Sequence, residues 1–148
     1  MVDDSEQKII LLTGASRGIG HATVRKFSEE NWRVITCSRQ AFDTKCPWPG
    51  GEANHVQVDL SNPNNTLEAI DEVKKRLNGK LLALVNNAGI YPIFKLETAS
   101  DEQLRSVINT NVLGAMYACR EAIPLLKKSK GDIINVSSEA VRFYPPLL

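Results

Sequence analysis

The stretch Thr13-Gly14-Ala15-Ser16-Arg17-Gly18-Ile19-Gly20 decides the fold, because it follows a short apolar run and leads directly into a segment of helical periodicity. A helix that begins at such a turn presents unpaired backbone N–H groups and the positive end of its dipole, and both favour a bound anion. Glycines let the backbone turn sharply and approach a ligand closely. The motif therefore predicts a diphosphate site, while an ordinary tight strand-to-helix turn is its plainer interpretation in isolation.

Short apolar runs alternate with helical segments along the rest of the chain. This order predicts a doubly wound parallel sheet of the Rossmann type, in three α/β/α layers. Ser100 and Gln103 have capping-box spacing at the start of a long helix, and Gly131 marks its expected exit. Residues 41–54 contain Pro and Gly in place of helical periodicity and are expected to be a surface loop. The expected strands are 8–13, 33–37, 55–60, 81–85 and 132–136, and the expected helices are 18–31, 66–77 and 100–126.

The second and third of these helices each have an apolar face at helical spacing. We expect both faces to pack on the sheet, as crossover helices do. Asn111 lies on the face of the longer helix, where a buried amide without partners costs about 1–3 kcal/mol. The apolar positions are Leu67, Ile70, Val73 and Leu77 in the shorter helix, and Leu104, Ile108, Val112, Ala115 and Cys119 in the longer one.

Composition indicates one domain over residues 1–148 and excludes several classes of function. With 43% hydrophobic residues, a chain of 148 residues can bury roughly two thirds of its unfolded surface. Lys and Arg total 18 against 17 Asp and Glu, without a block of either sign, so no nucleic-acid partner is expected. The acidic amino terminus and the short apolar runs predict a cytoplasmic protein without membrane contact. Cys37, Cys46 and Cys119 are widely spaced without nearby His partners, so we expect reduced thiols and no metal site.

Four motifs in register give the chain a resemblance to the short-chain dehydrogenase/reductase family of the classical type. The glycine spacing is Gly-x-x-x-Gly-x-Gly, and Val58-Asp59-Leu60, Asn86-Asn87-Ala88-Gly89 and Val136-Ser137-Ser138 follow at the ends of later predicted strands. Open α/β sheets place their ligand crevice at this edge. Family members usually continue for about another hundred residues, so the resemblance implies an incomplete domain that lacks the last family elements.

The end of the second predicted strand indicates NADP(H) as the cofactor. A fold that prefers NAD(H) normally has Asp or Glu there to hold the ribose 2′-hydroxyl. Here the strand ends in Ser38 and Arg39, and Arg17 lies in the glycine turn. An arginine can pair bidentately with a 2′-phosphate and a serine can donate to it, unless both arginines are merely solvated surface residues. The nucleotide contacts implied by these residues and by the resemblance are Gly14, Ser16, Arg17, Gly18, Ile19, Gly20, Ser38, Arg39, Asp59, Leu60, Asn87, Ala88 and Gly89.

Carbonyl reduction by hydride transfer needs donors directed at the carbonyl oxygen and an acid that protonates it. The resemblance implies that Ser138 orients the carbonyl and that Asn111 holds a water of the proton relay. A turn or cap role for the serine, and a structural role for the amide, are the alternatives. The family's acid belongs to a Tyr-x-x-x-Lys motif about a dozen residues after the serine, which the 148 residues do not reach. Tyr144 precedes two prolines, and Tyr91 with Lys95 follows a different strand, so neither pattern is expected to supply the acid.

Together, the residues and the resemblance imply an NADP(H)-dependent oxidoreductase that acts on a small-molecule carbonyl or alcohol, with its Tyr/Lys pair beyond this chain. The 148 residues alone are expected to be inactive, and the family implies a homodimer or homotetramer. Two alternatives stay open: a non-catalytic NADP(H)-binding sensor or interaction module, and a phosphate-binding fold without redox chemistry. Without the later elements, Ile133, Ile134 and Val136 are expected on an uncovered edge strand. His21 and His55 receive no function from the sequence.

Overall fold

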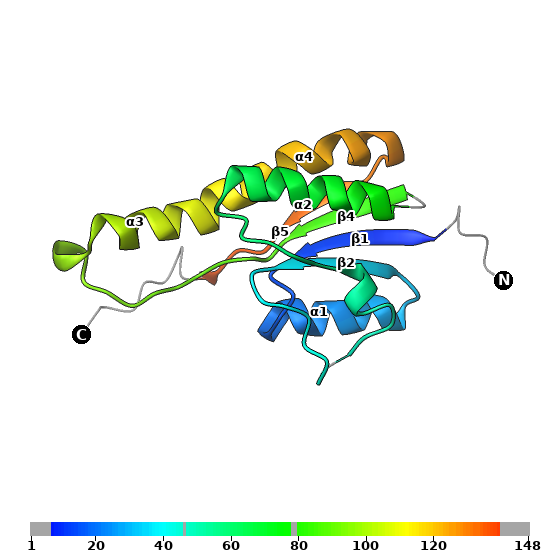
Figure 1. The fold of residues 1–148 in the computed structure, drawn as a ribbon, viewed down its shortest axis with the longest axis horizontal. Helices are drawn as coiled ribbons and strands as arrows, with labels where there is room; N and C mark the ends of the chain where they lie inside the picture. The colour runs from blue at the N-terminus through cyan, green and yellow to red at the C-terminus, as the bar shows by residue number, and fades with distance from the viewer. Residues whose placement is uncertain (1–6, 46, 78–79, 140–148) are drawn as a thin grey trace.

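The computed structural model describes residues 7–45, 47–77 and 80–139, and its centre is a five-stranded parallel sheet (Figure 1). The strand order is β3-β2-β1-β4-β5, so β1 is central and the winding reverses between β1 and β4. This is the doubly wound sheet that the sequence predicts, with a switch point at which such folds bind ligands. The strands are β1 Lys8–Thr13, β2 Arg33–Ser38, β3 His55–Gln57, β4 Lys80–Asn86 and β5 Asp132–Asn135.

Helices cover both faces of the sheet and bury it on both sides. Figure 1 shows α1 (Gly18–Glu29) below the sheet and α2 (Pro63–Arg76) with α4 (Gly114–Ser129) above it. Because successive side chains of a strand point to opposite faces, Ile10 and Leu12 of β1 join the core under α1, while Ile9 and Leu11 join the core under α2 and α4. Burial on both faces explains the nearly continuous apolar run of this strand.

The expected long helix follows one path but is divided by a widened turn. It consists of α3 (Asp101–Ile108), a π-helical segment η4 (Asn109–Leu113) and α4, and the capping box of Ser100 and Gln103 is confirmed. Figure 1 shows α3 projecting beyond the end of the sheet. The expectation that Leu104, Ile108 and Val112 pack on the sheet is wrong for the described residues, because these side chains are 37–53% exposed. The buried positions of α4 are Gly114, Ala118, Ala122 and Leu126.

Three local expectations also need correction. β3 ends at Gln57, three residues earlier than expected. Leu67 is 41% exposed, although Ile70 and Val73 of the same predicted face are buried. The left-handed residue that ends α4 is Lys130, with φ of 55°, one position before the glycine expected there. Gly131 is required for another reason, because a Cβ at this position would lie 2.7 Å from the carbonyl oxygen of Leu82.

The edge strand β5 agrees with a further expectation. Ile133, Ile134 and Val136 are 38–46% exposed, as predicted for an uncovered edge. None of the helices among the described residues combines the length and apolar character needed to cross a bilayer.

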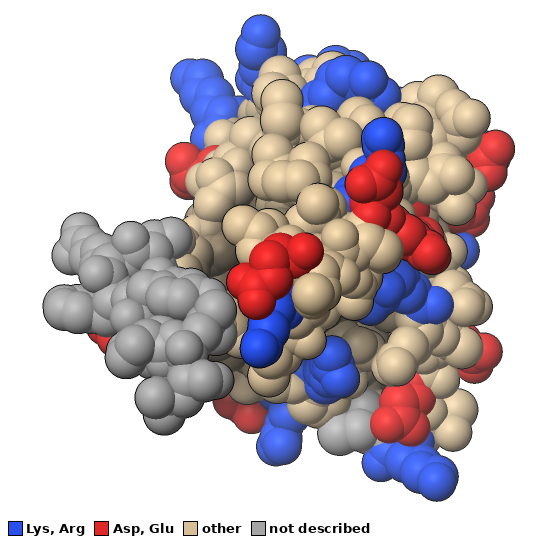
Figure 2. All heavy atoms as spheres, turned by 90° about the vertical axis from the view of Figure 1, so that its left-hand side faces the viewer, with Lys and Arg blue, Asp and Glu red and all other residues tan. Residues whose placement is uncertain are grey.

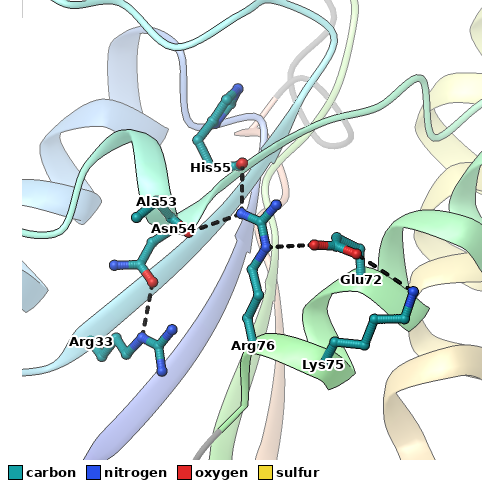
Figure 3. A network of polar contacts seen from close by, with 7 residues as sticks. All are labelled: Arg33, Ala53, Asn54, His55, Glu72, Lys75 and Arg76. Carbon is teal, nitrogen blue, oxygen red and sulfur yellow. Dashed lines mark hydrogen bonds and ion pairs between the residues drawn. The ribbon is translucent and has the colours of Figure 1, made fainter.

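The connection from β2 to β3 is a loop, as predicted, with one short 3-10 turn, η2 (Glu52–Asn54). Trp48 of this loop is 9% exposed and packs edge-on against Phe42, with the ring centroids 4.8 Å apart. The buried amide of Asn54 accepts a hydrogen bond from Arg33 Nε at 2.9 Å and donates to the carbonyl of Gly50 at 3.0 Å (Figure 3). Aromatic packing and one buried amide thus fold a loop that lacks helical periodicity.

Arg76, near the end of α2, ties this loop to the helix layer (Figure 3). Its Nη1 donates to the carbonyls of Ala53 at 2.9 Å and His55 at 3.1 Å, and its Nε donates to Glu72 Oε1 at 3.0 Å. The neighbouring Lys75 pairs with the same carboxylate at 3.7 Å, but its side chain is 75% exposed. Of these two cations, Arg76 is the one that bonds to the start of β3.

We expect Arg76→Met to lower the free energy of unfolding by about 1–3 kcal/mol, because it leaves loop carbonyls without their donor. Lys75→Met is the matched control, with an expected change below about 0.5 kcal/mol, since exposed ion pairs contribute little. Urea unfolding followed by circular dichroism measures both. Equal losses for the two variants would show that Arg76 acts only as a surface charge.

Candidate functional site

A cavity of about 490 Å³ lies at the carboxyl ends of β1, β2 and β4, beside the start of α1. Every residue that the sequence nominates as a nucleotide contact lines this one cavity. A wider hollow of about 620 Å³ adjoins it between β3 and α2 and shares Arg39, Val58 and Asp59 with it. Additional lining residues that the sequence did not indicate are Cys37, Gln40, Val58, Ile90 and Thr110.

The structure favours glycine at the three glycine positions of the turn for different reasons. A Cβ on Gly14, which has φ of +70°, would lie 2.6 Å from the Cα of Ala88, and one on Gly20 would lie 2.2 Å from the carbonyl oxygen of Gly14. These two positions exclude side chains because backbone segments meet there. Gly18 has φ of +56°, and a Cβ there would have no atom within 4 Å. At Gly18, which lines the cavity, the positive φ rather than close packing favours a glycine.

The first turn of α1 has no internal partner for its positive end. Its N-cap residue, Arg17, makes no side-chain capping hydrogen bond, and the first turn contains no acidic residue. The first backbone N–H groups of a helix have no partner within the helix itself. A bound anion such as a diphosphate would satisfy them, so the residues present fit this group.

Thr13 and Asn87 bind the glycine turn to the end of β4. The hydroxyl oxygen of Thr13, which is 2% exposed, accepts hydrogen bonds from the backbone N–H groups of Asn87 and Ala88, both at 3.1 Å. The side-chain amide of Asn87 donates to the carbonyls of Thr13 at 3.2 Å and Gly14 at 3.0 Å. Thr13 received no role from the sequence, although a polar residue that directly follows four apolar residues at the end of a strand is a usable signal.

The end of β2 presents cations to the cavity but not the serine hydroxyl proton. Arg17 and Arg39 are exposed and line the cavity. Ser38 is 6% exposed and its hydroxyl donates to the carbonyl of Gln40 at 3.0 Å, so the expected donation to a 2′-phosphate would require this bond to break. The Asp59 carboxylate accepts hydrogen bonds from the backbone N–H and the hydroxyl of Ser61.

Figure 2 faces the edge of the molecule toward which the strands of Figure 1 run. Lys and Arg side chains are interspersed there with Asp and Glu side chains, without a continuous patch of either sign. The cations beside the cavity are therefore local features of the site rather than part of a basic surface.

Asn111 lies in the π-helical segment and clamps the chain that follows β4. Its Oδ1 accepts from the backbone N–H of Ile90 and its Nδ2 donates to the carbonyl of Ile90, each at 2.8 Å. The side chain is exposed, not buried as the sequence suggested, and both of its polar atoms are engaged. Single π turns often occur at functional sites, and this one aims an amide at a residue that lines the cavity.

The remaining candidates lie around the ends of β4 and β5. Ser138 is exposed, three residues beyond β5, whose end stays paired with β4 through the Val136 N–H and the Asn86 carbonyl at 2.9 Å. Tyr91 is 72% exposed and is absent from the described lining of the cavity. Tyr144 and Cys46 lie outside the described residues.

The thiol at the floor of the cavity is held neutral. Cys37 is completely buried, and this burial raises the pKa of its thiol to about 12, against a smaller lowering by the charge of Arg76. Cys37 and Cys119 are free thiols. Since the thiolate is the reactive form, Cys37 contributes packing rather than a nucleophile.

This fold and the motifs at its strand ends define a class of protein. The model of the short chain dehydrogenase family matches residues 8–147, and the chain belongs to the short-chain dehydrogenase/reductase family. It is an oxidoreductase family, and the nicotinamide nucleotides NAD and NADP are bound in related structures.

Individual relatives cover almost all of this chain. Protein FixR of Bradyrhizobium diazoefficiens is 46% identical in an alignment 148 positions long, which covers 94% of this chain and 53% of FixR. A Brucella ovis oxidoreductase of the family, in complex with a partially ordered NAD, has a TM-score of 0.87 and 45% identity over 95% of this chain and 67% of its own. ElxO with NADP bound has a TM-score of 0.80 and 28% identity, over 95% and 59%. The chain thus spans about half the length of the curated relatives it matches.

Proposed function

We propose that the chain carries the nucleotide-binding part of an NADP(H)-dependent oxidoreductase, which transfers hydride between nicotinamide and a small-molecule carbonyl or alcohol. The observation that carries this proposal is the uncapped start of α1 at the cavity, where Gly18 leaves open space. Such a helix start suits the diphosphate of a dinucleotide. Membership of the family supports a nicotinamide nucleotide as the occupant.

The preference for NADP(H) rests on charge at the end of β2. Ser38, Arg39 and Gln40 line the cavity there, and none carries the carboxylate that would repel a 2′-phosphate. Arg39 and Arg17 supply two cations, and a guanidinium matches the geometry of a phosphate. The Brucella ovis structure holds NAD and ElxO holds NADP, so likeness to relatives is compatible with either nucleotide. The proposed preference for NADP(H) over NAD(H) therefore rests on the charges of Arg17 and Arg39.

On the substrate side we propose roles for Ser138 and Asn111. The nicotinamide, when bound, supplies or accepts the hydride. Ser138, beyond the end of β5, would donate a hydrogen bond to the substrate oxygen, and Asn111 would order Ile90 and the proton path beside it. The proton donor would come from a Tyr/Lys pair outside these 148 residues, so the chain alone would be inactive.

Turnover by the full-length gene product distinguishes this proposal from a non-catalytic one. We expect NADPH oxidation with members of a broad panel of aldehydes and ketones. Tight NADPH binding without turnover on any of them would favour an NADP(H)-binding sensor or interaction module.

We expect Arg39→Gln to raise the dissociation constant for NADPH about 10- to 100-fold, because a charge-assisted hydrogen bond is worth about 1.5–3 kcal/mol. The constant for NADH should change less than about two-fold, since its ribose offers only a hydroxyl at this position. Isothermal titration calorimetry measures both nucleotides. Arg25→Gln is the matched control, because Arg25 is an exposed cation of α1 that does not line the cavity. Equal binding of NADPH and NADH by the wild-type chain would contradict the assignment.

We also propose that residues 1–148 form one domain of a cytoplasmic homodimer or homotetramer. Large apolar side chains along the long helix support self-association, since exposed apolar surfaces mark interfaces. Sedimentation equilibrium of the full-length product tests this, and a monomer would contradict it. The exposed side chains are Ile108, Val112, Met116 and Ile123.

A further inference from the structure

The turn at residues 38–40, which forms one wall of the cavity, is held from outside by side chains of β3. The carbonyl oxygen of Gln40 accepts a hydrogen bond from the His55 ring at 2.9 Å as well as from the Ser38 hydroxyl at 3.0 Å. The carbonyl oxygen of Arg39 accepts from Gln57 Nε2 at 3.0 Å. Two consecutive carbonyls of the turn are thus directed at donors on the neighbouring strand.

The contacts of His55 fix its tautomer and its orientation. A backbone carbonyl can only accept, so His55 Nε2 carries the proton that Gln40 receives. In the neutral ring Nδ1 is then an acceptor, and the Thr36 hydroxyl lies 2.8 Å from it as the donor. Thr36 is completely buried in β2, directly opposite His55 in the strand register. Both ring nitrogens are therefore engaged, one with the core and one with the turn.

The backbone of His55 is equally restrained. Its carbonyl accepts from Arg76 of α2 at 3.1 Å, as Figure 3 shows, and its ring packs against Phe42 with the centroids 6.1 Å apart. A small cavity of about 50 Å³ beside the ring is lined by Ser38 and Gln40 as well as by His55. A series of hydrogen bonds therefore connects Arg76 of α2, through His55, to Gln40 in the wall of the nucleotide cavity.

These hydrogen bonds fix the directions of the backbone carbonyl and N–H groups of the turn, and hence which of them can face a phosphate. Carbonyl oxygens carry partial negative charge, and those of Arg39 and Gln40 are directed at β3 donors. In a trans peptide the N–H points opposite to the preceding C=O, so the N–H of Gln40 is directed away from Gln57. Gln40 lies between the two fixed peptide groups, and Arg39 directly precedes the first of them. A guanidinium forms two parallel bonds to a phosphate only when its backbone is correctly placed.

We propose that His55 is a positioning residue that sets the discrimination between a 2′-phosphorylated and a 2′-hydroxyl ribose, by holding the Gln40 carbonyl and hence Arg39. The inference rests on the proposed function and adds to it a residue outside the cavity lining. His55 touches neither nucleotide in this scheme. It acts through the geometry of the turn alone.

Three substitutions separate the two ring contacts. His55→Leu removes both of them. His55→Gln extends an amide toward the position of Nε2, where it can donate to Gln40, whereas His55→Asn can replace only Nδ1 and its bond with Thr36. The ratio of dissociation constants for adenosine 2′,5′-bisphosphate and 5′-AMP is measured by calorimetry on the wild-type chain and each variant, with NADPH and NADH as a second pair. Urea unfolding verifies that each variant is folded.

We expect His55→Leu to lower the preference for the 2′-phosphate about five-fold, which is the effect of losing one hydrogen bond between Arg39 and this phosphate. The affinity for 5′-AMP should stay within about two-fold of wild type. His55→Gln should recover most of the preference and His55→Asn should not. A folded His55→Leu variant with the wild-type ratio, an equal loss for both ligands, or identical ratios for the Gln and Asn variants would each overturn the inference alone. A wild-type chain without any preference would overturn the cofactor proposal together with it.

Discussion

Gly20→Ala is expected to lower the free energy of unfolding by about 3 kcal/mol or more, whereas Gly18→Ala is expected to leave a folded chain with much weaker binding of NADPH. The added methyl group on residue 20 would lie 2.2 Å from the carbonyl oxygen of Gly14 and 2.5 Å from Asn87 Nδ2. Neither group can move without breaking the junction between β1 and β4. A methyl group on residue 18 meets no atom within 4 Å.

The residual effect of Gly18→Ala on the fold comes from its backbone, because φ of +56° costs a non-glycine residue about 1–2 kcal/mol. Its new methyl group projects into the space proposed for the diphosphate, so affinity for NADPH should fall by at least about 100-fold, equivalent to about 2.7 kcal/mol. Urea unfolding and calorimetric titration with NADPH are measured on both variants. A Gly18→Ala variant that binds NADPH as the wild type does would refute the location of the diphosphate.

Thr13→Val is expected to lower the free energy of unfolding by about 2–5 kcal/mol, although the two side chains have almost the same shape. The valine leaves the N–H groups of Asn87 and Ala88 without their acceptor, and each unpaired buried group costs about 1–3 kcal/mol. Thr13→Ser is the matched control, because it keeps the oxygen and loses a single methyl group, at about 1 kcal/mol. Thermal and urea unfolding measure the difference. If the valine variant proved as stable as the serine variant, Thr13 would not join the two strand ends.

The sheet could be predicted from the sequence because its inner strands are buried on both faces and read as short apolar runs. Helical periodicity located the helices equally well, and the capping box gave the start of α3. Periodicity did not reveal which apolar faces are covered. Ile108 and Val112 fit the helical pattern, yet Ile108 at the end of α3 and Val112 in η4 are both exposed.

The lining of the cavity could be predicted because the carboxyl ends of parallel strands converge at one edge of a sheet, so motifs placed there along the chain meet in space. The contacts that hold the lining in place could not. The pairing of His55 with Thr36 depends on the register between β2 and β3, and no local pattern encodes it. The hydrogen bond from Ser38 to Gln40 likewise depends on how the turn closes, and it uses the proton that the hydroxyl was expected to donate to a 2′-phosphate.

The strand order has a consequence for synthesis on the ribosome. β1 emerges first and lies in the centre; β2 and then β3 add on one side, and β4 and then β5 add on the other. Among the five strands that the structure describes, none inserts between two that have already paired. Each newly translated strand can pair with an edge strand of the sheet that has already formed. The sheet can therefore grow outward from β1 without the breaking of earlier strand pairs.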